Sequence, residues 1–173
     1  MIQKLASQIY IHSDTLSHDE NEFDNNSDSL VNFNQEVPHI QNDDSKGTVS
    51  FSLLYDMQEH ILHITIKQAF NLPVDDMSRG TVNSYVNICL VPEDFLWKKT
   101  KLVENCRHPV FNEHFEIHDV LHHKLREYIL CLFIMDRTSN FGERVIGKIM
   151  YPLSDLRAGS IVDACVELLQ FYE

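Results

Sequence analysis

The chain has 173 residues and a formal net charge of −12 at pH 7, and this length suits one domain with a tail. The acidic balance argues against nucleic acid as a partner and against strong charge-driven binding to anionic membranes, because both need clustered Lys and Arg. The 43% hydrophobic and 10% aromatic residues are enough to form a globular core.

The first segment, residues 1–46, is rich in Asn, Ser and Asp and shows no sustained periodicity. Nine acidic residues against two lysines give it a charge of −7. Such a segment cannot bury enough apolar surface to offset the entropy of ordering, so we predict a disordered acidic tail. Ile2, Leu5 and Ile9 fall at helical spacing, which leaves a short amphipathic contact as the alternative.

From residue 47 onward the hydrophobic period changes to two, which is typical of half-buried antiparallel strands. In "GTVSFSLLYD", Val49, Phe51 and Leu53 alternate with polar residues, and "ILHITIKQA" has the same pattern. Further short runs lie at residues 84–91, 97–103, 114–120, 126–135, 145–153 and 164–171. About eight strands in residues 47–173 predict one all-β domain, an eight-stranded antiparallel β-sandwich.

One short helix is expected at "DVLHHKLRE", residues 119–127, where Asp119 can cap the first turn.

The longest apolar run, "YILCLFIM", is far shorter than the roughly 20 residues of a membrane span, so it predicts a buried strand. The start "MIQKLASQIY" lacks the apolar stretch of a signal peptide. Four cysteines without a CxxC pair indicate a reduced, cytoplasmic chain.

Catalytic motifs are missing from the sequence: we find no GxSxG, no phosphate-cradling glycine loop and no HExxH. The chain is therefore not expected to be an enzyme.

Zinc needs three or four converging ligands. His114 and His118 share a strand face, and His122 and His123 follow, but the sequence joins no further ligand to them. We expect them to be ordinary surface histidines.

Several segments resemble, in order, a synaptotagmin-type C2 domain over residues 47–172: "GTVSFSLLYD", "LHITIKQAFNLP", "SYVNICLVPED", "TKLVENCRHPVFNEHFEI" and "VIGKIMYPL". The most specific piece is "HPVFNEHF", which is close to the family's NPVFNE turn. The resemblance implies an eight-stranded C2 sandwich whose loops at one end form the binding site. It does not cover the tail.

Calcium-binding members of this family use five acidic side chains from two loops, because Ca²⁺ takes about six to eight oxygen ligands. In the first loop the resemblance places the leading acid at Asp76 and the second at Asn83, which keeps an oxygen but loses the charge. Arg79 adds a positive charge to the same loop.

In the third loop the first acid falls on Ile134, which cannot coordinate an ion, and the second is retained as Asp136. The last acid falls in "FGER", where Glu143 could reach the site and Arg144 is as near by count. Fewer carboxylates and added arginines weaken an oxygen site. We therefore expect no metal cofactor, as in the divergent calcium-independent synaptotagmins.

Two further surfaces follow from the resemblance. Met77 and Phe141 would lie at loop tips that insert into membranes in some C2 domains, although single exposed apolar residues are common on any surface. Lys98, Lys99 and Lys101 match a strand that binds phosphoinositide headgroups in some members. Lysines that keep an edge strand from pairing are the alternative explanation.

The resemblance implies a non-catalytic C2 adaptor in vesicle and membrane trafficking. We expect it to act without calcium through trafficking proteins or another C2 domain, with weak or no phospholipid binding. It would be cytoplasmic, or peripheral on a vesicle or plasma membrane. Two alternatives stay open: a calcium-dependent phospholipid sensor that uses Asp76, Asn83, Asp136 and Glu143, and a regulatory C2 fragment of a larger tandem-C2 protein.

Overall fold

The structure is a computed structural model that describes residues 46–74, 80–92, 98–138 and 142–170. Residues 1–45 of the predicted tail and three candidate site residues, Asp76, Met77 and Phe141, lie outside these ranges. The chain divides into two units, residues 1–44 and residues 45–173, and the second unit contains every element described below.

The described residues of the second unit form strands and one short 3₁₀ helix. In chain order the elements are β1 (Thr48–Asp56), β2 (Ile61–Phe70), β3 (Ser84–Val91), β4 (Lys98–Lys99), β5 (Val110–Ile117), η1 (His122–Glu127), β6 (Ile129–Thr138), β7 (Gly142–Pro152) and β8 (Ile161–Glu167).

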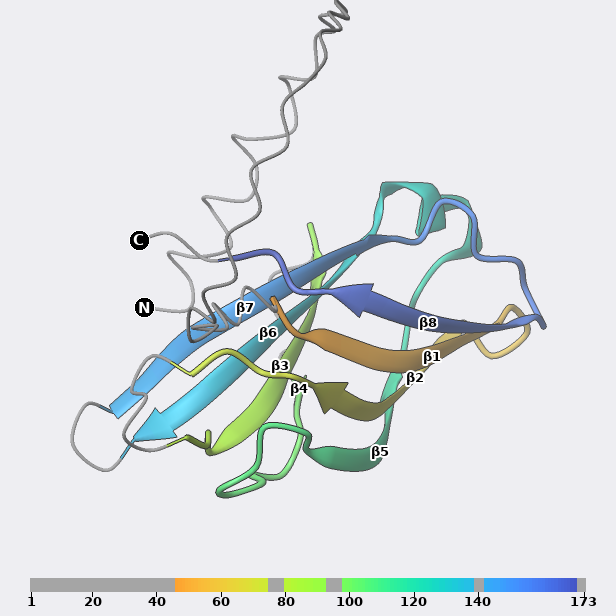
Figure 1. The fold of residues 1–173 in the computed structure, drawn as a ribbon. Helices are drawn as coiled ribbons and strands as arrows, with labels where there is room; N and C mark the ends of the chain where they lie inside the picture. The colour runs from red at the N-terminus through yellow and green to blue at the C-terminus, as the bar shows by residue number, and fades with distance from the viewer. Residues whose placement is uncertain (1–45, 75–79, 93–97, 139–141, 171–173) are drawn as a thin grey trace, which may run out of the picture. The chain divides into compact units, whose positions relative to one another are not determined.

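The strands form two four-stranded sheets, with the orders β5-β2-β1-β8 and β4-β3-β6-β7. Every pairing within the two sheets is antiparallel. The sheets face each other as the two layers of a sandwich (Figure 1). The predicted eight-stranded antiparallel β-sandwich is confirmed.

The core lies between the sheets and follows from the alternation in the sequence. Along β1, Val49, Phe51, Leu53 and Tyr55 are buried and their neighbours are partly exposed. From the opposite sheet, β3 and β6 contribute six further side chains to the same cluster: Val86, Ile88, Leu90, Leu130, Leu132 and Ile134. Burying one such side chain fully stabilises the fold by about 1.5–3 kcal/mol, so this cluster is the main source of the stability of the sandwich.

The predicted helix is shorter than expected and of a different type. It is a 3₁₀ helix that begins at His122, with Leu121 at the N-cap and no side-chain cap. Asp119 has a φ of 61° and does not cap it. A 3₁₀ turn suits this segment because it only has to cross from β5 in one sheet to β6 in the other.

The "HPVFNE" segment forms the start of β5 instead of a free turn. Asn112 adopts a φ of 48° there, next to an irregularity in the pairing of β5 with β2 between Ile66 and Gln68. Asn accepts this left-handed conformation more readily than most residues. The motif therefore encodes a local break in the ladder.

Candidate functional site

The loop end of the sandwich, where β3 begins and β6 ends, holds the retained acidic residue. Ser84 of β3 pairs with Asp136 of β6, so Asn83 arrives directly beside the Asp136 carboxylate. The Asp136 side chain has no exposed surface. A buried carboxylate needs hydrogen bonds and a compensating charge, and this one has both.

Two groups satisfy that carboxylate. The backbone N–H of Asn83 donates to Asp136 Oδ1 at 3.0 Å. Arg144, the cross-strand partner of Asp136 on β7, donates to Oδ2 from Nε at 3.2 Å and from a terminal nitrogen at 3.1 Å. The positive charge beside Asp136 is therefore supplied by the chain itself.

The Asn83 carboxamide is also committed to internal bonds. Its Oδ1 accepts the backbone N–H of Asn105 at 2.8 Å, and its Nδ2 donates to the backbone carbonyl of Arg137 at 3.1 Å. An aspartate at this position would lose the donor to Arg137. Asn83 thus links the start of β3 to the segment around Asn105 and to the end of β6.

Ile134 lies fully buried in the core, opposite Val86 on β3 and Gly147 on β7. Its side chain is part of the apolar cluster between the sheets.

Glu143 and Arg144 are adjacent on β7, so their side chains point to opposite faces of the sheet. Glu143 pairs with Arg137 in the register and hydrogen-bonds to the Tyr85 hydroxyl. The structure therefore brings Arg144 to Asp136 and turns Glu143 away from it. Burial first, and then the Glu143 hydrogen bond, raise the pKa of Tyr85 to about 12.

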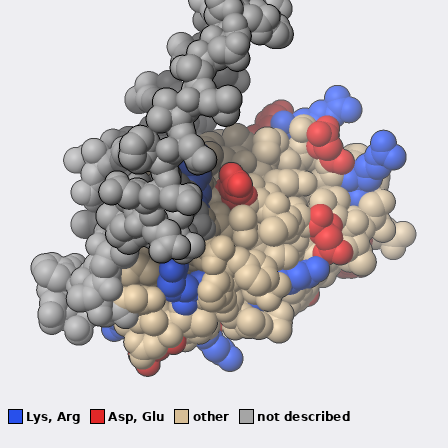
Figure 2. All heavy atoms as spheres, in the orientation of Figure 1, with Lys and Arg blue, Asp and Glu red and all other residues tan. Residues whose placement is uncertain are grey.

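The lysines of the possible headgroup patch do not share one role. Strand β4 contains only Lys98 and Lys99, both exposed, and Lys99 Nζ lies 5.8 Å from the centroid of the Tyr85 ring. Lys101 lies beyond the strand, and its backbone N–H donates to the Glu113 carboxylate at 2.7 Å. Figure 2 shows basic and acidic side chains interspersed on the visible face, without a large area of one sign.

Sequence reasoning identified Asp136, Asn83 and Arg144 but could not assign their contacts. The contact of Asn83 with Asn105 spans 22 positions and no motif marks it. No disulfide joins the four cysteines, all of which the structure describes: Cys89 and Cys131 are buried, Cys106 is half-buried and Cys165 is exposed. Across the described ranges, no helix is long and apolar enough to span a bilayer.

Comparisons with known proteins agree with this architecture. The C2 domain family model matches residues 60–168. Synaptotagmin-1 of Caenorhabditis elegans is 33% identical over 119 residues, which cover 68% of this chain and 26% of that protein. Human synaptotagmin-11 is 28% identical over 109 residues, which cover 62% of this chain and 25% of that protein.

A crystal structure of a C2 domain of RIM from Drosophila superimposes with a TM-score of 0.65 at 21% identity, and the match covers 71% of this chain and 98% of that chain. This likeness confirms the fold. The chain spans about a quarter of the length of the two synaptotagmins. The family match over most of the sandwich shows that the chain belongs to the C2 domain family.

Proposed function

We propose that this protein is a non-catalytic, calcium-independent C2 module in membrane trafficking, which acts through protein contacts and has at most weak phospholipid affinity. The observation that carries the proposal is the Arg144–Asp136 pair. Calcium at this end would have to displace a guanidinium that makes two hydrogen bonds to the same carboxylate oxygen. Separating such a pair leaves a buried charge without its partner, which is costly.

The remaining candidate ligands support the same conclusion. The Asn83 oxygen already accepts a backbone N–H, and Glu143 belongs to the opposite face of β7. The place of a further acid is taken by Ile134 in the core. A calcium site loses affinity as negatively charged ligands are replaced. Asn83 and Ile134 replace two of the acidic ligands in this way.

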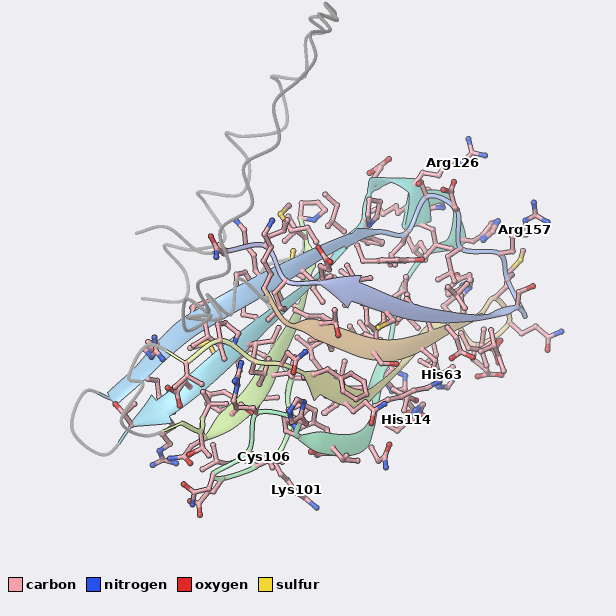
Figure 3. All side chains as sticks on the ribbon, in the orientation of Figure 1. His63, Lys101, Cys106, His114, Arg126 and Arg157 are labelled. Carbon is pink, nitrogen blue, oxygen red and sulfur yellow. The ribbon has the colours of Figure 1, made fainter. Side chains whose placement is uncertain are left out.

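A protein partner is favoured over a lipid surface by the charge distribution. The whole chain carries −12, β4 contributes two lysines, and the backbone N–H of the nearby Lys101 donates to the Glu113 carboxylate. At the end of the sandwich opposite to Asp136, a pocket of about 680 Å³ lies between η1 and residues 154–158. Arg126 and Arg157 line it together with Asp155, and Figure 3 shows both arginine side chains at this end of the sandwich. Two positive charges against one negative charge favour an acidic segment of a partner.

The test is cosedimentation of the full chain with liposomes that contain phosphatidylserine, in chelator and in about 1 mM free Ca²⁺, a level that fills even weak extracellular-type sites. We expect the same low bound fraction in both conditions. Calcium-dependent sedimentation would overturn the proposal in favour of a calcium-dependent phospholipid sensor. An Arg126→Ala, Arg157→Ala double variant serves in a parallel pull-down, where loss of partner capture would assign the contact to that pocket.

A further inference from the structure

The outer face of the β5-β2-β1-β8 sheet carries a cluster of histidine and carboxylate side chains that the loop-end site does not use. His63 on β2 is directly opposite Glu116 on β5, and Thr65 is opposite His114. His63 and His114 are therefore diagonal neighbours on one face, and the two side chains lie side by side in Figure 3.

Three ligand atoms of this cluster form a compact triangle. His63 Nδ1 lies 3.3 Å from His114 Nε2 and 3.6 Å from Glu116 Oε1, and His114 Nε2 lies 3.7 Å from the same Glu116 oxygen. His118 adds a further nitrogen, 3.5 Å from Glu116 Oε2. The described residues contain no other group of three or more metal-binding side chains this close together.

The size of the triangle fits a transition-metal ion. A point equidistant from atoms separated by 3.3, 3.6 and 3.7 Å lies about 2.0 Å from each of them, and Zn–N and Zn–O bonds measure about 2.0–2.2 Å. An ion of this size fits between the three atoms when it replaces the hydrogen shared by His63 Nδ1 and His114 Nε2. Two imidazoles and one carboxylate form a mixed nitrogen and oxygen donor set that suits zinc and disfavours Ca²⁺ and Mg²⁺.

Thr65 orients one of the ligands. Its Oγ1 lies 3.1 Å from His114 Nδ1. In the tautomer that carries its hydrogen on Nδ1, His114 donates to this hydroxyl, and its Nε2 keeps a lone pair that accepts from His63 Nδ1–H when no ion is bound. Hydrogen bonds of this kind accompany most metal-binding histidines and fix their tautomer.

The rest of the coordination sphere is open. The three side chains keep 23%, 51% and 45% of their surface exposed for His63, His114 and Glu116, so an ion can enter from solvent. A pocket of about 210 Å³ adjoins the two histidines and reaches β1 and Ile161. Sites with three protein ligands complete a tetrahedron with water, and this pocket has room for one.

We propose that His63, His114 and Glu116 form a surface zinc site with water as the fourth ligand. The site stands apart from the loop end, because it lies on β2 and β5 of the sheet that does not contain Asp136. Without an ion the same side chains form a stacked histidine pair beside a carboxylate, with ring centroids 5.4 Å apart. Zinc titration separates these two states.

The experiment is calorimetric titration of Zn²⁺ into the full chain after removal of metal with a chelator. We expect one equivalent to bind to the wild type and to be lost in His63→Ala, His114→Ala and Glu116→Gln. Thr65→Val should weaken binding by about 10–100-fold, the usual cost of losing an orienting hydrogen bond. His123→Ala is the matched control, since His123 is an exposed histidine on η1, and it should bind zinc as the wild type does.

Residues 1–45 also contain His12, His18 and His39, which can bind zinc by themselves. The proposed site is therefore identified by the zinc binding that the variants lose relative to the wild type. Nuclear magnetic resonance of the imidazole nitrogens provides a second readout, in which zinc should perturb His63 Nδ1 and His114 Nε2 and leave His123 unchanged. Circular dichroism of each metal-free variant checks its fold. The proposal is overturned if the wild type binds no zinc, or if His63→Ala and His114→Ala retain wild-type affinity.

Discussion

Arg144 directs two of its nitrogens at a single oxygen of the fully buried Asp136 carboxylate, at 3.2 and 3.1 Å. The two residues face each other across β6 and β7. We expect this pair to stabilise the loop end, and under the proposed function it also opposes calcium binding there.

Replacing Arg144 with Met should destabilise the fold by about 2–3 kcal/mol. Removing one partner of a buried ion pair costs about 3–5 kcal/mol, and the expected loss is smaller here because 32% of the Arg144 side chain is exposed. Urea unfolding measures it. Arg137→Met, on the exposed end of β6, is the control and should change stability by less than about 0.5 kcal/mol. Equal losses in both variants would contradict the role of the pair.

Calcium should leave the melting temperature of the metal-free protein unchanged. A ligand that binds only the folded state stabilises it in proportion to the logarithm of its concentration over Kd, about 2.7 kcal/mol at 100 times Kd. Because Arg144 is paired with Asp136 and the Asn83 oxygen already accepts a hydrogen bond, we expect no stabilisation by calcium. Differential scanning calorimetry in chelator and in about 1 mM free Ca²⁺ tests this. A rise of several degrees would reveal a site that these contacts do not block.

Tyr85 should make stability depend on pH in the alkaline range. Burial and the Glu143 hydrogen bond raise its pKa from 10.0 to about 12. Below pH 10 the folded and unfolded chains both hold the phenol proton, and the Tyr85 contribution is complete. Between about pH 10 and 12 the unfolded chain ionises first, so stability falls as the pH rises.

The measurement is urea unfolding at a series of alkaline pH values, from below the ordinary tyrosine pKa upward, for the wild type and Tyr85→Phe. The wild type should lose stability more steeply than the variant over this interval. Glu143→Gln should give an intermediate slope, because it removes the acceptor charge and leaves the burial. Parallel pH profiles for the wild type and Tyr85→Phe would refute the assignment.

Tyr55→Phe should cost about 1–2 kcal/mol. The buried Tyr55 hydroxyl donates to the backbone carbonyl of Val120 at 2.7 Å, and loss of one partner leaves a buried acceptor without this donor. The bond ties the end of β1 to the segment that leads into η1, where the chain crosses between sheets. Thermal or urea unfolding measures the loss, with Tyr151→Phe as a control that keeps the ring contact with Phe51. A Tyr55→Phe variant as stable as the wild type would contradict the prediction.

The sandwich was predictable because burial on one face of each strand leaves an alternation that needs no tertiary information, as Val49 and Phe51 show in β1. Element boundaries were less predictable. Within the described residues β4 ends at Lys99, because the backbone N–H of Val86 donates to the Thr100 hydroxyl, a side-chain contact that no alternation in the sequence marks. Asp119 had the chemistry of a cap, but its left-handed backbone excludes it from that role.

The site was predictable only in part. Asp136 and Ile134 occupy the places that the family pattern gave them, whereas the choice between Glu143 and Arg144 depended on the strand register of β6 and β7. The histidine cluster shows the same limit. His63 lies 51 positions before His114, and only the pairing of β2 with β5 brings the two together.

Under the proposed function, the guanidinium of Arg144 has a consequence for timing. This cation is part of the chain and cannot dissociate when the ion concentration of the solution changes. Its charge therefore acts at the loop end from the moment the chain folds. Partner binding would then not depend on calcium at that end, and its occupancy would follow the abundance of the protein and its partner instead of a transient ionic signal.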